Sequence, residues 1–344
     1  MNIPLLRLLN QQLATPRFGS PAEVVAWMGA MQAQDFRAVR QAIGMRMKSP
    51  SAARVDRAFD EGLIVRTHVM RPTWHAVAAQ DLRWMLMLSR ESNGRAYRGY
   101  LKATGIEFSP AVCDRAFDTL TAALSGGRSL TAAQLQPWFA ECGLPHTARH
   151  IHGYLWMAEN SALVCSGRLH PSQNTYALTD ERIAPQPLPS REEALARLAG
   201  NYFRSHAPAT LDDFLWWSGL TVTEARQAIA LIGSELTTET HQGITYHLHH
   251  SCRTQGQMPQ AAILLPPFDE YLLGYKDRTA VLPRSLQAHA FTNNGIFFPM
   301  VVHRGQLVGN WRRPTARNVV PSFSFFRDTP FDEALRKGWS LIQK

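Results

Sequence analysis

Residues 63–77 have the sequence LIVRTHVMRPTWHAV, and this stretch predicts a β-hairpin. The runs LIVRTHV and TWHAV are rich in β-branched and aromatic residues, which favour strands. Met70, Arg71 and Pro72 separate the two runs and form the expected turn. We therefore expect two antiparallel strands with Arg71 at their tip.

Three helices are expected before this hairpin, in IPLLRLLNQQL, SPAEVVAWMGAM and AARVDRAFDEG. The second begins with Ser20 as N-cap, Pro21 at the first helical position and Glu23 three residues after the cap, which is the pattern of a capping box. Helices followed by a hairpin "wing" are the order of a winged-helix DNA-binding domain. With the helical residues near 79 to 103, residues 1–103 are therefore predicted to form a first winged helix.

The same order of helices and a hairpin occurs twice more, at residues 104–182 and 190–252. The proline-rich segment ERIAPQPLPS lies between them and is expected to be a linker. Residues 255–344 contain short strand-like runs with Pro and Gly turns, in AAILLPPFDEYLLGY, TAVLP, GIFFPMVVHRGQLVGNWRR and VVPSFSFF, and end in the helical pattern FDEALRKGWSLIQ. The runs predict a small β-barrel, with a curled sheet as the alternative, and the last pattern predicts a terminal helix. The predicted fold class is mainly α with α+β elements, as tandem winged-helix motifs followed by this barrel.

The charge is distributed unevenly along the chain. Of 36 basic residues, 31 are Arg, and the net charge is +9. Residues 1–110 hold 15 Lys or Arg against 8 Asp or Glu, whereas the remainder holds 21 against 19. Arginine suits phosphates and bases, so the bias favours nucleic acid as a partner, although a GC-rich genome also explains a high Arg to Lys ratio. The N-terminal third is the expected electrostatic face.

Other classes of protein fit less well. No run approaches the ~20 apolar residues of a membrane span, and the N-terminus lacks the pattern of a signal peptide, so we expect a cytoplasmic protein without membrane contact.

The four cysteines contain no C-x-x-C pair, and His146 and His150 have no accompanying Glu as in H-E-x-x-H, so neither a metal nor another cofactor is expected. His247, His249 and His250 are expected to be solvated on a strand.

Five strings identify a family that the chain resembles: MQAQD, RTHVMRPTWHAV, DFLWWSGL, LLPPFDEYLLGYKDR and GQLVGNWRR. In this order they resemble the AlkZ/YcaQ group of winged-helix DNA glycosylases over nearly the whole chain. The resemblance implies three tandem winged helices and a β-barrel arranged as a C-shaped channel for duplex DNA. It also implies removal of N-alkylated purines, including crosslinks that join the N7 atoms of two guanines. The catalytic Gln-aliphatic-Gln motif of the family falls on Gln32-Ala33-Gln34, and a second branch has Gln-aliphatic-Asp instead.

Two neutral amides suit this reaction because an N7-alkylated guanine is already cationic and leaves as a neutral base. The site then has only to hold a water against the sugar and to stabilise the oxocarbenium-like cation with dipoles that are already in place. An amide carbonyl accepts a hydrogen bond from that water without being a strong base. A neutral adduct is expected to be a poor substrate.

The spacing of the glutamines requires a break in the helix. Residues two apart on a helix point roughly 200° apart, so Gln32 and Gln34 cannot both face one lesion from within it. Asp35 precedes the helical run FRAVRQAIGMRM and is expected to be its N-cap, with stabilisation of the sugar cation as the alternative role. The residues expected to contact DNA are Arg37, Arg40, Arg46, Lys48, Arg71, Arg312 and Arg313. Arg71 would contact phosphate or enter a groove, and simple exposure to solvent is the alternative for Arg71, Arg312 and Arg313.

Other residues in the matching strings are assigned structural roles. Trp216 and Trp217 offer a stacking platform for bases, but core packing is the expected outcome. The charges of LLPPFDEYLLGYKDR, with Asp269, Glu270 and Lys276, are expected to build a salt-bridged corner of the barrel, without a chemical role.

The predicted function is a monofunctional DNA glycosylase that acts as a monomer on double-stranded DNA carrying alkylated purines, near the nucleoid. The alternative is a non-enzymatic winged-helix regulator, which would present a recognition helix to the major groove and often dimerise. An interaction scaffold without DNA affinity is a third possibility, and the basic N-terminal third disfavours it.

Overall fold

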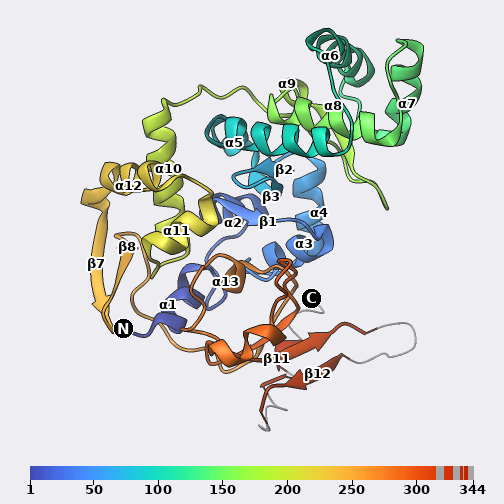
Figure 1. The fold of residues 1–344 in the computed structure, drawn as a ribbon. Helices are drawn as coiled ribbons and strands as arrows, with labels where there is room; N and C mark the ends of the chain where they lie inside the picture. The colour runs from blue at the N-terminus through green and yellow to red at the C-terminus, as the bar shows by residue number, and fades with distance from the viewer. Residues whose placement is uncertain (315–320, 328–333, 336, 340–344) are drawn as a thin grey trace. The chain divides into compact units, whose positions relative to one another are not determined.

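The structure is a computed structural model, and it describes residues 1–314, 321–327, 334–335 and 337–339 (Figure 1). The chain forms two compact units, of which the first contains residues 1–55 and 195–344 and the second contains residues 56–194. The divisions fall within helices α4 (Ala52–Asp60) and α10 (Arg191–Ser205). These boundaries fall within the first and the third of the four predicted domain ranges, and the ranges themselves stay predictions.

The first unit contains both ends of the chain and most of the short helices, several of which begin as the sequence predicts. Ser20 forms the predicted capping box with Glu23, and Thr210 and Thr221 form two more. These caps satisfy backbone N–H groups that would otherwise lack partners. Besides α10, the elements before residue 250 are α1 (Ile3–Asn10), α2 (Pro21–Met28), β1 (Ala30–Gln32), α3 (Phe36–Gly44), α11 (Leu211–Ser218), α12 (Val222–Leu231), η2 (Gly233–Glu235), β7 (Leu236–His241) and β8 (Ile244–His249).

The C-terminal part of this unit is an open antiparallel sheet of four strands in the order β12-β11-β10-β9. The predicted closed barrel is not found in the described residues, where β9 and β12 form the two edges of the sheet. Of the runs expected to be strands, residues 261–275 form only the short strand β9 and then a short helix, and residues 279–283 form no strand. Four strands are too few to close around a packed interior. The elements are β9 (Ile263–Leu265), α13 (Glu270–Leu273), η3 (Arg284–His289), β10 (Met300–His303), β11 (Gln306–Arg312) and β12 (Ser322–Phe325).

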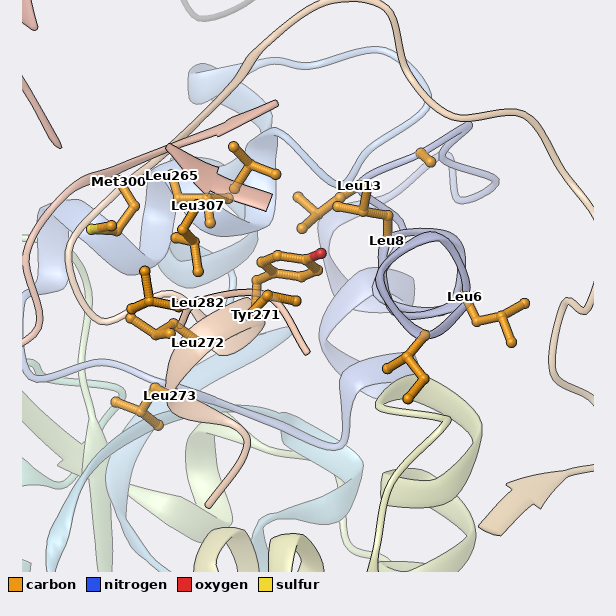
Figure 2. Packing of buried hydrophobic residues seen from close by; sticks show 14 of the residues in the cluster. Leu6, Leu8, Leu13, Leu265, Tyr271, Leu272, Leu273, Leu282, Met300 and Leu307 are labelled. Carbon is orange, nitrogen blue, oxygen red and sulfur yellow. The ribbon is translucent and has the colours of Figure 1, made fainter. Parts of the chain in front are cut away.

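The core of the first unit joins segments that are far apart in the sequence. Tyr271 of α13 lies between Leu8 and Leu13, from the N-terminal segment, and Leu265 and Leu307, from β9 and β11 (Figure 2). All five side chains are at least nine-tenths buried. The short helix α13 is therefore held in place by packing on both of its sides.

The second unit contains the hairpin predicted from residues 63–77. Strands β2 (Ile64–Val69) and β3 (Thr73–Ala78) pair antiparallel, with Ile64 opposite Ala78 and Val69 opposite Thr73. The turn between them places Met70 at φ +60°. The sequence prediction is confirmed for both strands and for the turn. Around them lie η1 (Ala79–Asp81), α5 (Leu82–Ala103), α6 (Pro110–Leu124), β4 (Leu130–Thr131), α7 (Ala132–Glu141), α8 (Ala148–Asn160), β5 (Val164–Ser166), β6 (Thr175–Leu178) and α9 (Thr179–Arg182).

The predicted terminal helix at residues 331–343 lies in part outside the described residues. Ala334, Leu335, Lys337, Gly338 and Trp339 are described, and they are helical. Within the described part of the chain, no helix combines the length and the apolar character needed to cross a bilayer.

Candidate active site around Gln32 and Gln34

The chain breaks its helical course at the two glutamines, as their spacing predicts. Helix α2 ends at Gly29, whose φ of +79° suits glycine, and the short strand β1 follows immediately. A Cβ atom at Gly29 would also lie only 3.0 Å from the Cβ of Asn201. Helix α3 then begins at Phe36, so Gln32 ends a strand and Gln34 lies in the bend between strand and helix.

Asp35 is the N-cap of α3, and its carboxylate accepts a hydrogen bond from the backbone N–H of Ala38 at 2.9 Å. A carboxylate at this position also interacts favourably with the positive end of the helix dipole. The predicted cap is confirmed, and Asp35 fixes the point at which the helix restarts after Gln34.

The two glutamines differ in environment and in hydrogen bonding. Gln32 is 8% exposed, whereas Gln34 is exposed. The side-chain carbonyl of Gln32 accepts a hydrogen bond from the backbone N–H of Gln34 at 3.0 Å. Because only the amide oxygen can accept from an N–H group, this contact fixes which way the Gln32 amide faces. Gln32 is therefore an oriented group in the wall of the site, and Gln34 is the glutamine that solvent reaches.

A buried carboxylate lies directly behind Gln32. Glu270, at the start of α13, is 2% exposed, and its Oε1 accepts a hydrogen bond from the backbone N–H of Gln32 at 2.7 Å. Its Oε2 lies 3.4 Å from Nε2 of His206, which is completely buried. The other ring nitrogen of His206 lies 2.8 Å from the hydroxyl of Ser205. Burial is the main cause that lowers the pKa of His206.

The neighbouring Asp269 forms a salt bridge that ties α13 to the end of α3. Both of its carboxylate oxygens accept hydrogen bonds from the guanidinium of Arg46, at 2.8 and 2.9 Å. The same guanidinium donates to the side-chain carbonyl of Gln11 at 3.1 Å. The expected internal salt bridge at Asp269 therefore exists, but its partner lies 223 residues away in the sequence. The charge of Lys276 instead faces Asp212 at 3.6 Å on the surface.

The prediction that Arg46 contacts DNA is wrong for this structure. Its side chain is completely buried, and its guanidinium is engaged by Asp269 and Gln11. A phosphate cannot reach a group in this position without breaking the core. Sequence alone suggested otherwise because arginines are usually exposed, and only burial distinguishes a paired core arginine from a surface one.

Other predicted phosphate contacts lie near Gln34. Arg37, in the first turn of α3, is exposed. Arg313 is half-buried, and its guanidinium donates to the side-chain carbonyl of Gln41. Burial and then the nearby charge of Arg37 lower the pKa of Arg313, while Asp35 opposes them, so these three charged groups lie close together. The structure thus places two cations beside the site.

The remaining predicted phosphate contacts are spread over both units. Lys48 and Arg312 are exposed, and the guanidinium of Arg40 lies 5.0 Å from the ring centroid of Phe36. Arg71 lies in the turn between β2 and β3 of the second unit and is half-buried. None of these positions prevents a contact with phosphate.

Trp217 is 1% exposed and belongs to the core, as expected. Trp216 is 38% exposed, and its indole N–H donates to the backbone carbonyl of Leu273 at 2.9 Å, which fixes the end of α13. Trp216 therefore supports the segment that carries Glu270, and the expectation of core packing is confirmed for Trp217 but wrong for Trp216.

A group with metal-ligand chemistry lies apart from the glutamines, at the base of the β7–β8 hairpin. Glu235, His249 and His250 place their ligand atoms within 4.8 Å of one another. However, Nδ1 of His249 accepts the backbone N–H of Ser251, so its Nε2 carries the proton and donates to Glu235 at 2.9 Å. Hydrogen bonding alone accounts for the contact between His249 and Glu235.

Comparisons with known proteins agree on one family. A model of the family described as "DNA glycosylase AlkZ-like" matches residues 25–333. The chain is 25% identical to an interstrand DNA cross-link repair glycosylase of Streptomyces sahachiroi, in an alignment covering 98% of this chain and 92% of that protein. It is also similar to the solved structure of the Streptomyces sahachiroi DNA glycosylase AlkZ, with a TM-score of 0.80, 20% identity, and coverage of 99% of this chain and 95% of that one. The structural similarity extends over the fold as a whole.

Proposed function

The chain belongs to the AlkZ-like DNA glycosylase family, and from this premise we propose that it is a monofunctional DNA glycosylase that excises cationic N7-alkylated purines from duplex DNA. The observation that carries the proposal is the arrangement of Gln32-Ala33-Gln34 in the break between β1 and α3. There Gln32 is held from both sides, by Glu270 and by the N–H of Gln34, and Gln34 is open to solvent.

In the proposed mechanism the two glutamines have different tasks. The carbonyl of Gln34 accepts a hydrogen bond from the water that attacks C1′ of the sugar. The amide of Gln32 contributes a fixed dipole at the wall of the site. The alkylated base carries a positive charge before the reaction and leaves as a neutral molecule with the electron pair of the broken N-glycosidic bond, so no general acid is required. The proton lost by the attacking water passes to the solvent. Dipoles that are already fixed in place stabilise the oxocarbenium-like cation without having to reorganise. This electrostatic stabilisation of the transition state supplies most of the catalysis in the proposed mechanism.

The monofunctional character follows from the chemistry of the motif. A bifunctional glycosylase needs an amine that attacks C1′ and forms a Schiff base. Amide nitrogens are not nucleophilic, so the glutamine site delivers water and leaves an abasic site.

Duplex DNA is the proposed partner. The proposed phosphate contacts are made by Arg37 and Arg313 beside the site, by Arg40, Lys48 and Arg312 elsewhere in the first unit, and by Arg71 at the hairpin tip of the second. They would set the position of the protein on the duplex without selecting a sequence. We further propose that the helices and hairpins form tandem winged helices around a channel for the duplex, and that the protein acts as a monomer in the cytoplasm.

The lesion includes, in this proposal, crosslinks that join the N7 atoms of two guanines. The relative from Streptomyces sahachiroi is named for the repair of interstrand cross-links, and the similarity to it extends over nearly all of both chains. Each end of such a crosslink is a cationic N7-alkylguanine, so the same site chemistry applies to it.

The test is incubation of the protein with duplexes that carry one N7-methylguanine, one N7-linked crosslink or a neutral adduct, followed by alkaline cleavage at abasic sites. We expect strand cleavage at the cationic lesions and little at the neutral adduct. Absence of excision from every cationic lesion, with duplex binding intact, would support a DNA-binding regulator instead.

A further inference from the structure

We propose that Glu270 is a positioning residue for the glutamine site, because its carboxylate holds the Gln32 peptide in the orientation that the reaction needs. This inference rests on the proposed glycosylase function and adds to it a residue outside the motif. Glu270 does not face the lesion itself and acts through the backbone of Gln32.

The first step of the argument is a chain of two hydrogen bonds that ends at Gln34. Oε1 of Glu270 accepts from the N–H of Gln32 at 2.7 Å, and Oε1 of Gln32 accepts from the N–H of Gln34 at 3.0 Å. A carboxylate is a stronger acceptor of backbone N–H groups than a neutral carbonyl. The orientation of both glutamines therefore depends on one buried side chain.

The second step is that Glu270 is itself immobilised. The following residues, Tyr271, Leu272 and Leu273, pack into the core on the same short helix (Figure 2). His206 lies against the carboxylate, and its ring is stacked on Tyr202 with centroids 4.7 Å apart. A side chain that is held this rigidly also fixes the position of the peptide that it binds. Residues that support the contacting groups of a functional site act in this way.

The approach of His206 also depends on Gly274, one turn after Glu270. A Cβ atom on Gly274 would lie 2.7 Å from both the backbone oxygen of Glu270 and Cδ2 of His206. Only glycine permits the histidine to come this close to the carboxylate. The glycine in the string LLPPFDEYLLGYKDR therefore permits the contact between His206 and Glu270.

The third step concerns the cost of this arrangement. Burying a carboxylate is unfavourable unless hydrogen bonds compensate for the lost hydration. An apolar side chain at this position would pack in the same core without that cost. The N–H group that donates to the carboxylate belongs to Gln32, the first glutamine of the motif. The unfavourable burial of Glu270 therefore accompanies a hydrogen bond that fixes the geometry of the site.

The experiment compares three substitutions at Glu270 in the full-length protein. Glu270→Gln keeps an amide oxygen where Oε1 lies, Glu270→Asp keeps the charge but withdraws it by one methylene, and Glu270→Ala removes the acceptor. Single-turnover excision of N7-methylguanine, duplex affinity and the melting temperature are measured for each. Hydrogen exchange of the peptide around Gln32 reports directly on the N–H that the carboxylate binds.

We expect Glu270→Ala to lose about 10² in the excision rate, the scale of a misplacement of about 1 Å, with duplex affinity nearly unchanged. Glu270→Asp should lose less and Glu270→Gln least, and exchange at Gln32 should accelerate in the same order. Glu159→Ala is the matched control. It removes another buried carboxylate, which is 2% exposed and lies 2.8 Å from Nδ1 of His68 in the second unit, and it should lower the melting temperature without changing the excision rate.

The outcomes separate this inference from the proposed function. Excision by the wild type with an unchanged rate in Glu270→Ala would overturn the positioning role alone. Equal losses in Glu270→Gln and Glu270→Ala would assign the effect to charge and overturn it as well. Absence of excision by the wild type would overturn the glycosylase function. Should Glu270→Ala not fold, the order of rates in the Asp and Gln variants decides.

Discussion

The side-chain carbonyl of Gln32 accepts a hydrogen bond from the backbone N–H of Gln34, with 3.0 Å between the two atoms. The first glutamine of the motif thereby organises the backbone of the second. Gln32 is nearly buried and Gln34 is exposed, so the two amides are not interchangeable.

Gln34→Ala should reduce single-turnover excision of N7-methylguanine by roughly 10² or more, since this is the scale of losing one prearranged polar group. Gln32→Ala should also lose activity, but the two losses need not add because the Gln32 side chain also holds the backbone of Gln34, so the two residues act as a unit. The measurement is the rate of abasic-site formation with enzyme in excess.

The matched control for this prediction is Gln227→Ala, which removes an exposed glutamine from α12. It should leave the excision rate unchanged, and duplex affinity should barely move in any of these variants. Full activity in the double alanine variant at Gln32 and Gln34 would refute the glutamine mechanism even if the protein is a glycosylase.

Arg37→Ala should weaken binding to undamaged duplex and make it less dependent on salt. Arg37 is exposed beside Gln34, and its charge adds to that of Arg313. Each lost phosphate contact should reduce the slope of log K against log salt concentration by about 0.9. Fluorescence anisotropy over a range of salt concentrations measures the slope, and Arg226→Ala on α12 is the control. Equal slopes in the wild type and Arg37→Ala would exclude the contact.

Arg46→Ala should destabilise the protein by about 3–5 kcal/mol, because it leaves the carboxylate of Asp269 buried without its partner. Urea unfolding measures this free energy. The double substitution Arg46→Met with Asp269→Leu should recover part of it, since no unpaired charge remains. Unchanged stability in Arg46→Ala with weakened DNA binding would restore the original prediction that Arg46 contacts phosphate.

Acidification below about pH 6.5 should lower the free energy of unfolding. Burial is the main cause that lowers the pKa values of His206, His247, His249 and His303 from 6.5. The unfolded chain therefore binds protons near pH 6.5 that the folded protein does not, and stability is lost as the pH falls toward the folded pKa values. The melting temperature between pH 7.5 and 5.5 tests this, and His303→Gln should flatten the dependence. A melting temperature that rises on acidification in this range would contradict the prediction.

Local patterns in the sequence determined several individual elements of both units. The capping box of Ser20 and Glu23, the cap at Asp35 and the hairpin at residues 64–78 all depend on neighbours within a few positions, and the structure has each of them. The interruption at Gln32 and Gln34 followed from the family motif together with local geometry, because a helix cannot direct residues two apart to one side. The motif and the family were recognisable from the strings themselves.

Tertiary structure alone decided what surrounds the motif. The partners of Gln32 and Arg46 lie 238 and 223 residues away, so no local pattern pairs them. The sequence predicted that Arg46 contacts phosphate, whereas the structure buries its side chain in the core. The sequence assigned no chemical role to Glu270, whereas in the structure its carboxylate accepts a hydrogen bond from the backbone N–H of Gln32. The number of strands available to the C-terminal sheet was likewise set by packing, which folds the run around Glu270 into a helix. Sequence specifies local hydrogen bonds through short-range sterics, whereas the burial and partner of a charged side chain depend on which distant segments pack together.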